Sequence, residues 1–149
     1  MKVYLGRAVT GQIGPRSLEA VQLAHRALLE AGAEVLCERV ADPEYRSGID
    51  RPELVAEMMR RELLEADAGC FEMTGASTGA GFEAGWLAGR SRPVLFLYDA
   101  DHPPASVVPR FPPFEHCVSL AYADLLEVRP AVSDFCRTIA THVALRANR

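Results

Sequence analysis

Short apolar runs alternate with longer stretches of helical periodicity along most of the chain, and this alternation limits the fold more than any other feature. Apolar runs typical of strands lie at residues 2–5, 34–40, 67–73, 93–98 and 116–122, and segments typical of helices at 17–31, about 52–64, 82–89 and 131–147. A strand that returns to the same sheet through a helix runs parallel to the strand before it. The pattern therefore predicts an α/β protein with one parallel five-stranded sheet.

We expect a doubly wound sheet of flavodoxin-like order 2-1-3-4-5, with helices on both faces and a single domain over residues 1–149. Ser17, Asp50 and Pro130 are the residues expected to open the first, second and last helices. In sheets of this kind, ligands bind beyond the carboxyl ends of the strands, near the point where the strand order reverses. The loops at 6–16 and 74–81 should therefore meet there and form a site.

Composition and charge exclude several classes of protein. Apolar residues make up 49% of the chain and the net charge is -4, so wholesale disorder and binding to a nucleic-acid polymer are not expected. We expect no membrane span and no signal peptide, because apolar runs are short and the chain enters its first strand directly after Met1. The 4 cysteines lack CxxC spacing, which favours reduced core thiols in a cytoplasmic protein over a metal or disulfide role.

The glycine-rich segment after the third predicted strand is the strongest candidate for a site. Residues 77–85 read Ser-Thr-Gly-Ala-Gly-Phe-Glu-Ala-Gly, and their glycine spacing differs from the dinucleotide-binding fingerprint. The glycines allow a close approach of backbone to ligand, and we expect Glu83 in the first turn of the helix that follows, where the helix dipole favours the anion. On these residues alone, a solvated capping glutamate is the commoner role; an ionised nucleophile is the alternative.

The same segment resembles the S-x-G-x-G-[YF]-E-x-G motif of the nucleoside 2-deoxyribosyltransferase family. Among its members the chain is most similar in shape to the 2'-deoxynucleoside 5'-phosphate N-hydrolases. The similarity extends to residues 3–6 at the first strand and 63–67 before the third, and the order of elements agrees over about residues 1–125. The resemblance implies cleavage of an N-glycosidic bond, by hydrolysis or by exchange of the base.

The resemblance also implies roles for individual residues. The glutamate matching Glu83 attacks C1' of the sugar, as in retaining glycosidases. Ser77 matches a serine that contacts the 5' end of the substrate, and Ser106 falls where N-hydrolases present a serine from a neighbouring subunit. Gly6, Gly79 and Gly81 are further candidates for the sugar-phosphate pocket. Apart from the resemblance, Arg7 could hold phosphate with the help of Thr10, and a solvated loop arginine is the alternative. The implied ligand is a small nucleoside or nucleotide, the implied assembly a homodimer or higher oligomer, and neither a metal nor an organic cofactor is implied.

The chain departs from the family pattern at three places, one of which is the segment after Gly6: N-hydrolases show a serine and an arginine there, and this chain has Arg-Ala-Val-Thr-Gly at residues 7–11. An aspartate of the second helix is replaced by Met59, and a first-strand tyrosine aligns with Val3. The adjacent Tyr4 should point to the opposite face of the sheet, since side chains alternate along a strand. Glu72 is the candidate for the missing acid or for the partner of an arginine, and His102 is the histidine worth testing as a proton donor.

These departures keep two other functions open. One is a non-catalytic nucleotide-binding or sensor protein on the same scaffold. The other is a flavodoxin-like domain that binds a different phosphate ligand.

Overall fold

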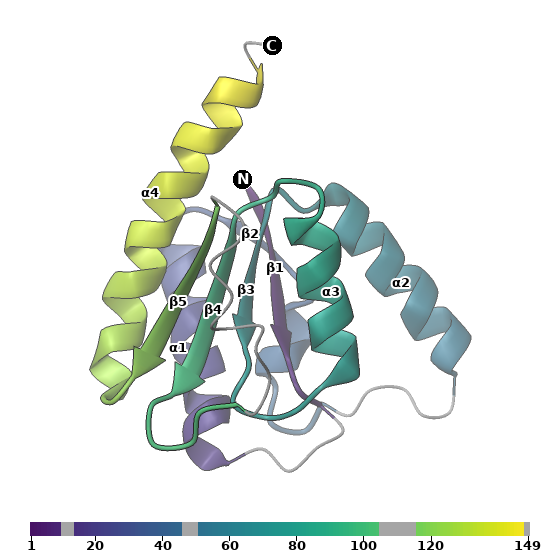
Figure 1. Cartoon of the computed structure of the whole chain (residues 1–149). Helices are drawn as coiled ribbons and strands as arrows, with labels where there is room; N and C mark the ends of the chain where they lie inside the picture. Colours follow the sequence, from purple (N-terminus) through teal and green to yellow (C-terminus); the bar gives the residue numbers. More distant parts are fainter. Residues whose placement is uncertain (10–13, 46–50, 105–115, 148–149) are drawn as a thin grey trace.

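The computed structural model describes residues 1–9, 14–45, 51–104 and 116–147, and its centre is a five-stranded parallel sheet (Figure 1). The sheet order is β2-β1-β3-β4-β5, as predicted. The strands are β1 (Lys2–Arg7), β2 (Glu34–Leu36), β3 (Ala68–Glu72), β4 (Val94–Asp99) and β5 (Cys117–Tyr122). The predicted fold class and strand order are thus confirmed.

Two pairs of helices cover the two faces of the sheet (Figure 1). Helices α1 (Pro15–Glu30) and α4 (Val128–Ala147) pack on one face, and α2 (Pro52–Glu65) and α3 (Thr78–Ala88) on the other. All five residues of β3 are buried, as expected for a strand covered on both faces. No helix of the described segments is long and apolar enough to cross a bilayer.

The second strand is shorter than predicted. It ends at Leu36 and not at Val40, because Cys37 adopts a left-handed backbone conformation with φ of 60°. Such a residue cannot continue an extended strand. The chain instead turns into the 3-10 helix η1 (Glu38–Ala41), which brings its side chains toward the carboxyl end of β1.

Three helices begin earlier than predicted. Helix α1 begins at Pro15, whose fixed φ suits a first helical position, so Ser17 lies inside the helix and is not its cap. Helix α4 begins at Val128, so Pro130 is its third residue. Helix α3 begins at Thr78 rather than near Phe82, and the expected cap Asp50 lies outside the described residues.

Gly6 of β1 is packed too closely for any side chain. A Cβ atom there would lie 2.3 Å from Cδ1 of Phe71 and 3.4 Å from Oε2 of Glu83. Phe71 is fully buried on the neighbouring strand and has no room to withdraw. The bare backbone of Gly6 therefore lets the Phe71 ring and the Glu83 carboxylate both lie against the end of β1.

We predict opposite effects on stability for two glycine substitutions. Gly6→Ala should lower the free energy of unfolding by about 1–3 kcal/mol or more, since it overpacks the core. Gly81→Ala, inside α3 with nothing within 4 Å of its Cβ position, should raise it by about 0.5–1 kcal/mol, because alanine is the better helix former. Chemical denaturation measures both; a neutral Gly6→Ala would contradict the packing described here.

Candidate active site

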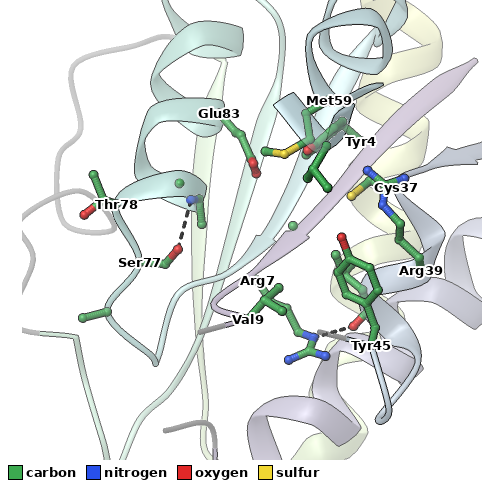
Figure 2. A pocket seen from close by; sticks show the side chains of 16 residues that line it. Tyr4, Arg7, Val9, Cys37, Arg39, Tyr45, Met59, Ser77, Thr78 and Glu83 are labelled. Atoms are coloured by element: carbon green, nitrogen blue, oxygen red, sulfur yellow. Dashed lines mark hydrogen bonds between the residues drawn. The ribbon is translucent and has the colours of Figure 1, made fainter. Parts of the chain in front are cut away.

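A cavity of about 320 Å³ lies where β1, η1, α2 and the start of α3 meet (Figure 2). This is at the carboxyl end of β1, where the sequence predicts a site. The cavity is lined by Tyr4, Gly6, Arg7, Val9, Cys37, Arg39, Val40, Tyr45, Val55, Met59, Ala76, Ser77, Thr78, Gly79, Ala80 and Glu83. Among these described lining residues, Glu83 provides the one carboxylate.

The N-terminus of α3 forms one side of the cavity. Ser77 caps the helix, its Oγ accepting a hydrogen bond of 3.1 Å from the Ala80 amide. Gly79 also lines the cavity, whereas Gly81 is absent from its lining. Residues 78–81, predicted as the end of the 74–81 loop, are therefore the first turn of the helix, and a helix N-terminus beside a cavity is suited to an anion.

Glu83 points from α3 toward the centre of the cavity, and its residue is only 6% exposed (Figure 2). It is the sixth residue of α3 and does not lie in the first turn, so the helix dipole acts on it less than expected. Burial raises its pKa to about 7, while the Tyr4 hydroxyl and the Arg39 guanidinium act in the opposite direction and Glu62 adds to the rise. The carboxyl group is thus divided between its charged and neutral forms near neutral pH.

Tyr4, not Val3, is the first-strand residue that faces this site. Tyr4 and Gly6 are two residues apart on β1 and both line the cavity, so the expectation that Tyr4 points to the opposite face is wrong. Side chains do alternate along β1, but Tyr4 and not Val3 lies on the same face of the strand as Gly6. Burial raises the pKa of the Tyr4 hydroxyl, which lies beside the Cys37 thiol and the Glu83 carboxylate.

An arginine and a methionine complete the wall formed by η1 and α2. Arg39 binds Glu62 of α2 through two hydrogen bonds of 2.7 Å, and this pairing raises the pKa of Arg39. The Cys37 amide donates to the same carboxylate at 3.3 Å, so Glu62 fixes η1 against α2. Met59 lines the cavity at the position of the family aspartate, and its thioether cannot donate a proton.

Arg7 lies in the floor of the cavity with its guanidinium turned to the backbone. Its Nε donates to the Val40 carbonyl, Nη1 to the Ala8 carbonyl at 3.1 Å and Nη2 to the Asp42 carbonyl at 3.2 Å. These contacts tie the end of β1 to η1. A role in holding phosphate stays a prediction for Arg7, and a phosphate would have to compete with these carbonyl groups.

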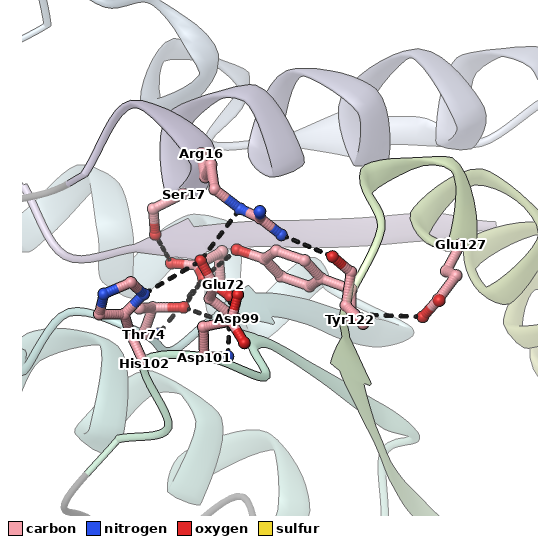
Figure 3. A network of polar contacts seen from close by, with 10 residues as sticks. Arg16, Ser17, Glu72, Thr74, Asp99, Asp101, His102, Tyr122 and Glu127 are labelled. Carbon is pink, nitrogen blue, oxygen red and sulfur yellow. Dashed lines mark hydrogen bonds and ion pairs between the residues drawn. The ribbon is translucent and has the colours of Figure 1, made fainter.

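Glu72 lies apart from the cavity, in a buried polar network among α1, β3, β4 and β5 (Figure 3). It accepts hydrogen bonds from the hydroxyls of Ser17, Thr74 and Tyr122, the last at 3.0 Å. Burial raises its pKa, and these hydrogen bonds act against the rise. His102 contacts Asp99 in the same network at 3.4 Å and does not line the cavity.

The structure therefore brings only some of the predicted site residues together. Gly6, Arg7, Ser77, Gly79 and Glu83 line one cavity, whereas Glu72 and Gly81 do not. Thr10 and Ser106 lie outside the described residues.

Two curated relatives match nearly the whole chain. One from Methanosarcina barkeri is 33% identical over 138 residues, covering 90% of this chain and 84% of the relative. One from Methanosarcina mazei is 35% identical over 141 residues, covering 92% of this chain and 84% of the relative. Both carry the name "Putative 2'-deoxynucleoside 5'-phosphate N-hydrolase 1".

The chain belongs to the 2'-deoxynucleoside 5'-phosphate N-hydrolase family. The resemblance inferred from residues 77–85 is thereby confirmed, although no family model matches the chain. Solved structures agree on the fold. BlsM superposes with a TM-score of 0.71 at 17% identity, covering 96% of this chain and 93% of its own. The CMP N-glycosidase BcmB of Clostridium botulinum superposes with a TM-score of 0.62 at 15% identity, and the match covers 89% of this chain and 98% of BcmB.

Sequence reasoning missed two residues of this N-hydrolase cavity, Arg39 and Tyr45. Both follow β2, and extending that strand to Val40 concealed the turn that brings them to the site. The sequence reasoning also set Tyr4 aside. Tyr4 lies two residues before Gly6 on β1, and this spacing alone places both residues on the same face of the sheet.

The raised pKa of Glu83 predicts a pH-dependent cost to stability. Because the folded pKa of about 7 exceeds the ordinary 4.5, folding favours the protonated acid. Relative to Glu83→Gln, the wild type should lose stability as the pH rises from about 4.5 to about 7, by up to about 3 kcal/mol at about 1.4 kcal/mol per pKa unit. Denaturation of both proteins across this range measures the difference; parallel curves would show that Glu83 keeps its ordinary pKa.

Proposed function

We propose that this protein cleaves the N-glycosidic bond of a nucleoside 5'-monophosphate with Glu83 as the nucleophile. The observation that carries the proposal is a buried carboxylate in a cavity beside the capped N-terminus of α3. The curated relatives are named as hydrolases of 2'-deoxynucleoside 5'-phosphates, and BcmB is described as a CMP N-glycosidase. Those names support a nucleotide substrate.

The arrangement of the cavity suggests how the substrate lies. The phosphate would sit at the amide groups that open α3, near Ser77, Thr78 and Gly79, since this helix end attracts anions. The sugar would lie against the backbone of Gly6, which lines the cavity beside Glu83. The base would then extend to the wall formed by η1 and α2.

The reaction follows the two steps of a retaining glycosidase. The Glu83 carboxylate attacks C1', the C1'–N bond breaks, and its electron pair leaves with the base. A glycosyl ester of Glu83 remains, and water attacks C1' of this ester, which restores the carboxylate and releases the sugar phosphate. Tyr4 stabilises the charged form of Glu83 before the attack, because its hydroxyl lowers the pKa of that carboxyl group.

Removal of the carboxylate should abolish turnover. Glu83→Ala and Glu83→Gln should each lower base release from nucleoside 5'-monophosphates on the order of 10³-fold or more, since both lack the nucleophile. Release is measured by chromatography across a panel of ribo- and deoxyribonucleotides, with Gly85→Ala as the matched α3 control, since Gly85 is absent from the cavity lining and nothing lies within 4 Å of its Cβ position. Undiminished release by Glu83→Ala would eliminate Glu83 as nucleophile.

The pH profile of the same reaction provides a further check. Only ionised Glu83 can attack, so kcat/KM of the free enzyme should rise with pH and level off above about 7. A labelled free base added to the assay separates the two reaction types: its incorporation into nucleotide indicates transfer, and its exclusion indicates hydrolysis.

A nucleotide sensor on the same scaffold is the second candidate. Met59 favours it, because the cavity wall offers a thioether where the family pattern has an acid. Nucleotide binding by calorimetry without release of any base would support the sensor and contradict the enzyme.

We also propose that the protein forms a homodimer. Phe82 of α3 is 64% exposed and its ring lies 6.3 Å from that of the partly buried Trp86, so an apolar ring is exposed on the helix that carries Glu83. Light scattering should give about twice the 16.3 kDa chain mass for the wild type and a smaller mass for Phe82→Ser. Leu126→Ser is the control, since Leu126 is exposed on η3 (Leu125–Glu127). A monomeric wild type would overturn the proposal.

We further propose a cytoplasmic location. All 4 cysteines are free, which fits a reducing compartment, and the proposed substrate is a cytoplasmic metabolite class. Fractionation of cells that produce the protein tests this, and recovery in a secreted fraction would contradict it.

A further inference from the structure

Arg39 is held on the wall of the cavity that faces Glu83 (Figure 2). Two of its nitrogens bind Glu62, but its Nε is buried and has no hydrogen-bond partner among the described residues. A buried donor without an acceptor costs free energy unless a ligand or water satisfies it. Glu62 fixes the guanidinium plane, so the remaining N–H groups keep one orientation.

The groups around Arg39 fit a flat, partly apolar ligand. The Tyr45 ring lies 5.9 Å from the Arg39 guanidinium carbon, and Val55 and Met59 of α2 also line the cavity. The phosphate end of the cavity is at Ser77, beyond Glu83 as seen from Arg39 (Figure 2). A nucleotide bound with its sugar at Glu83 therefore extends its base toward Arg39.

The departing base meets few proton donors on this wall. The described lining has no histidine and no carboxyl group other than Glu83, and burial raises the pKa of the Cys37 thiol to about 12. Met59 has no proton to give. The phenolic O–H groups of this lining are those of Tyr4 and Tyr45, and a base that leaves without a proton from either departs as an anion, which a fixed positive charge stabilises as the C1'–N bond breaks.

We propose that Arg39 donates a hydrogen bond to the carbonyl oxygen next to the glycosidic nitrogen of the departing base, and that the enzyme therefore prefers pyrimidine nucleotides. This inference rests on the function proposed above. In a pyrimidine the electron pair of the broken bond passes to N1 and is shared with O2, the atom within reach of Arg39; water later protonates the base. A purine has no carbonyl beside its glycosidic nitrogen, so Arg39 gains no such acceptor there.

Kinetics on matched substrates test the proposal. Wild-type kcat/KM should be at least about tenfold higher for dUMP and dCMP than for dAMP, since a polar group left without its partner disfavours the purine. Arg39→Ala should lower kcat for dUMP about 100-fold, as does loss of one preorganised donor to a developing anion, and lower kcat for dAMP less than about threefold. Arg60→Ala is the matched control on α2, because this exposed arginine pairs only with Glu57 in the described structure.

A second readout separates stabilisation of the leaving base from a merely structural role. The loss caused by Arg39→Ala should shrink for 5-fluoro-dUMP, whose base is the better leaving group, and free guanidinium should partly restore the dUMP rate. Circular dichroism and thermal unfolding verify that the variant folds. If it does not, Arg39→Gln, which keeps a hydrogen-bond donor near Glu62, takes its place and should show the same substrate dependence.

The outcomes distinguish this inference from the proposed function. If the wild type releases bases through Glu83 but Arg39→Ala lowers dUMP and dAMP turnover equally, the Arg39 proposal alone is overturned. If no nucleotide is cleaved, calorimetry decides: weaker binding of dUMP but not dAMP to Arg39→Ala supports recognition of the carbonyl, and equal effects overturn it.

Discussion

The burial of one carboxyl group constrains everything else in this protein. Glu83 is removed from water between α3 and β1, and desolvation alone would keep it neutral. Tyr4 and Arg39 act against that penalty, and they come from two different elements, β1 beneath the cavity and η1 across it. The folding of the β2–η1 segment and the charge state of Glu83 are therefore linked.

The two glutamates of the sheet region have separate surroundings. Glu72 ends β3 on the side of α1, where three hydroxyl groups and the Thr74 amide surround it. Glu83 belongs to α3, in the helix layer on the other face of the sheet, and it lines a cavity together with an arginine and apolar residues. A carboxylate with several hydroxyl donors is well suited to connect strands and a helix, whereas one with an open cavity before it remains available to react. The two environments are separate because Glu72 contacts α1 on one face of the sheet, whereas Glu83 belongs to α3 on the other face.

The sequence was sufficient to predict the sheet order, the edge at which the cavity lies and the glutamate inside it. Alternating apolar runs determine a parallel topology, and residues 77–85 carry a motif whose backbone and side chain are adjacent in the chain. The rest depends on contacts between distant segments. The left-handed conformation of Cys37 ends β2, and no local sequence pattern predicts it. Arg39 and Tyr45 reach the cavity because of that turn. The position of Glu72 follows from hydroxyl partners on α1, on β5 and in the loop after β3. The residues next to Glu72 in the sequence do not indicate these partners.

The contact between Gly6 and Phe71 has a consequence for how this family can diversify. The two residues are paired neighbours on β1 and β3, and the aromatic ring occupies the volume that a side chain at position 6 would need. Homologues that acquire a larger residue at the first position should carry a smaller one at the second, so the pair should covary. Changes in the shape of the cavity at Gly6 would then be accompanied by compensating changes inside the sheet, at a residue outside the cavity lining.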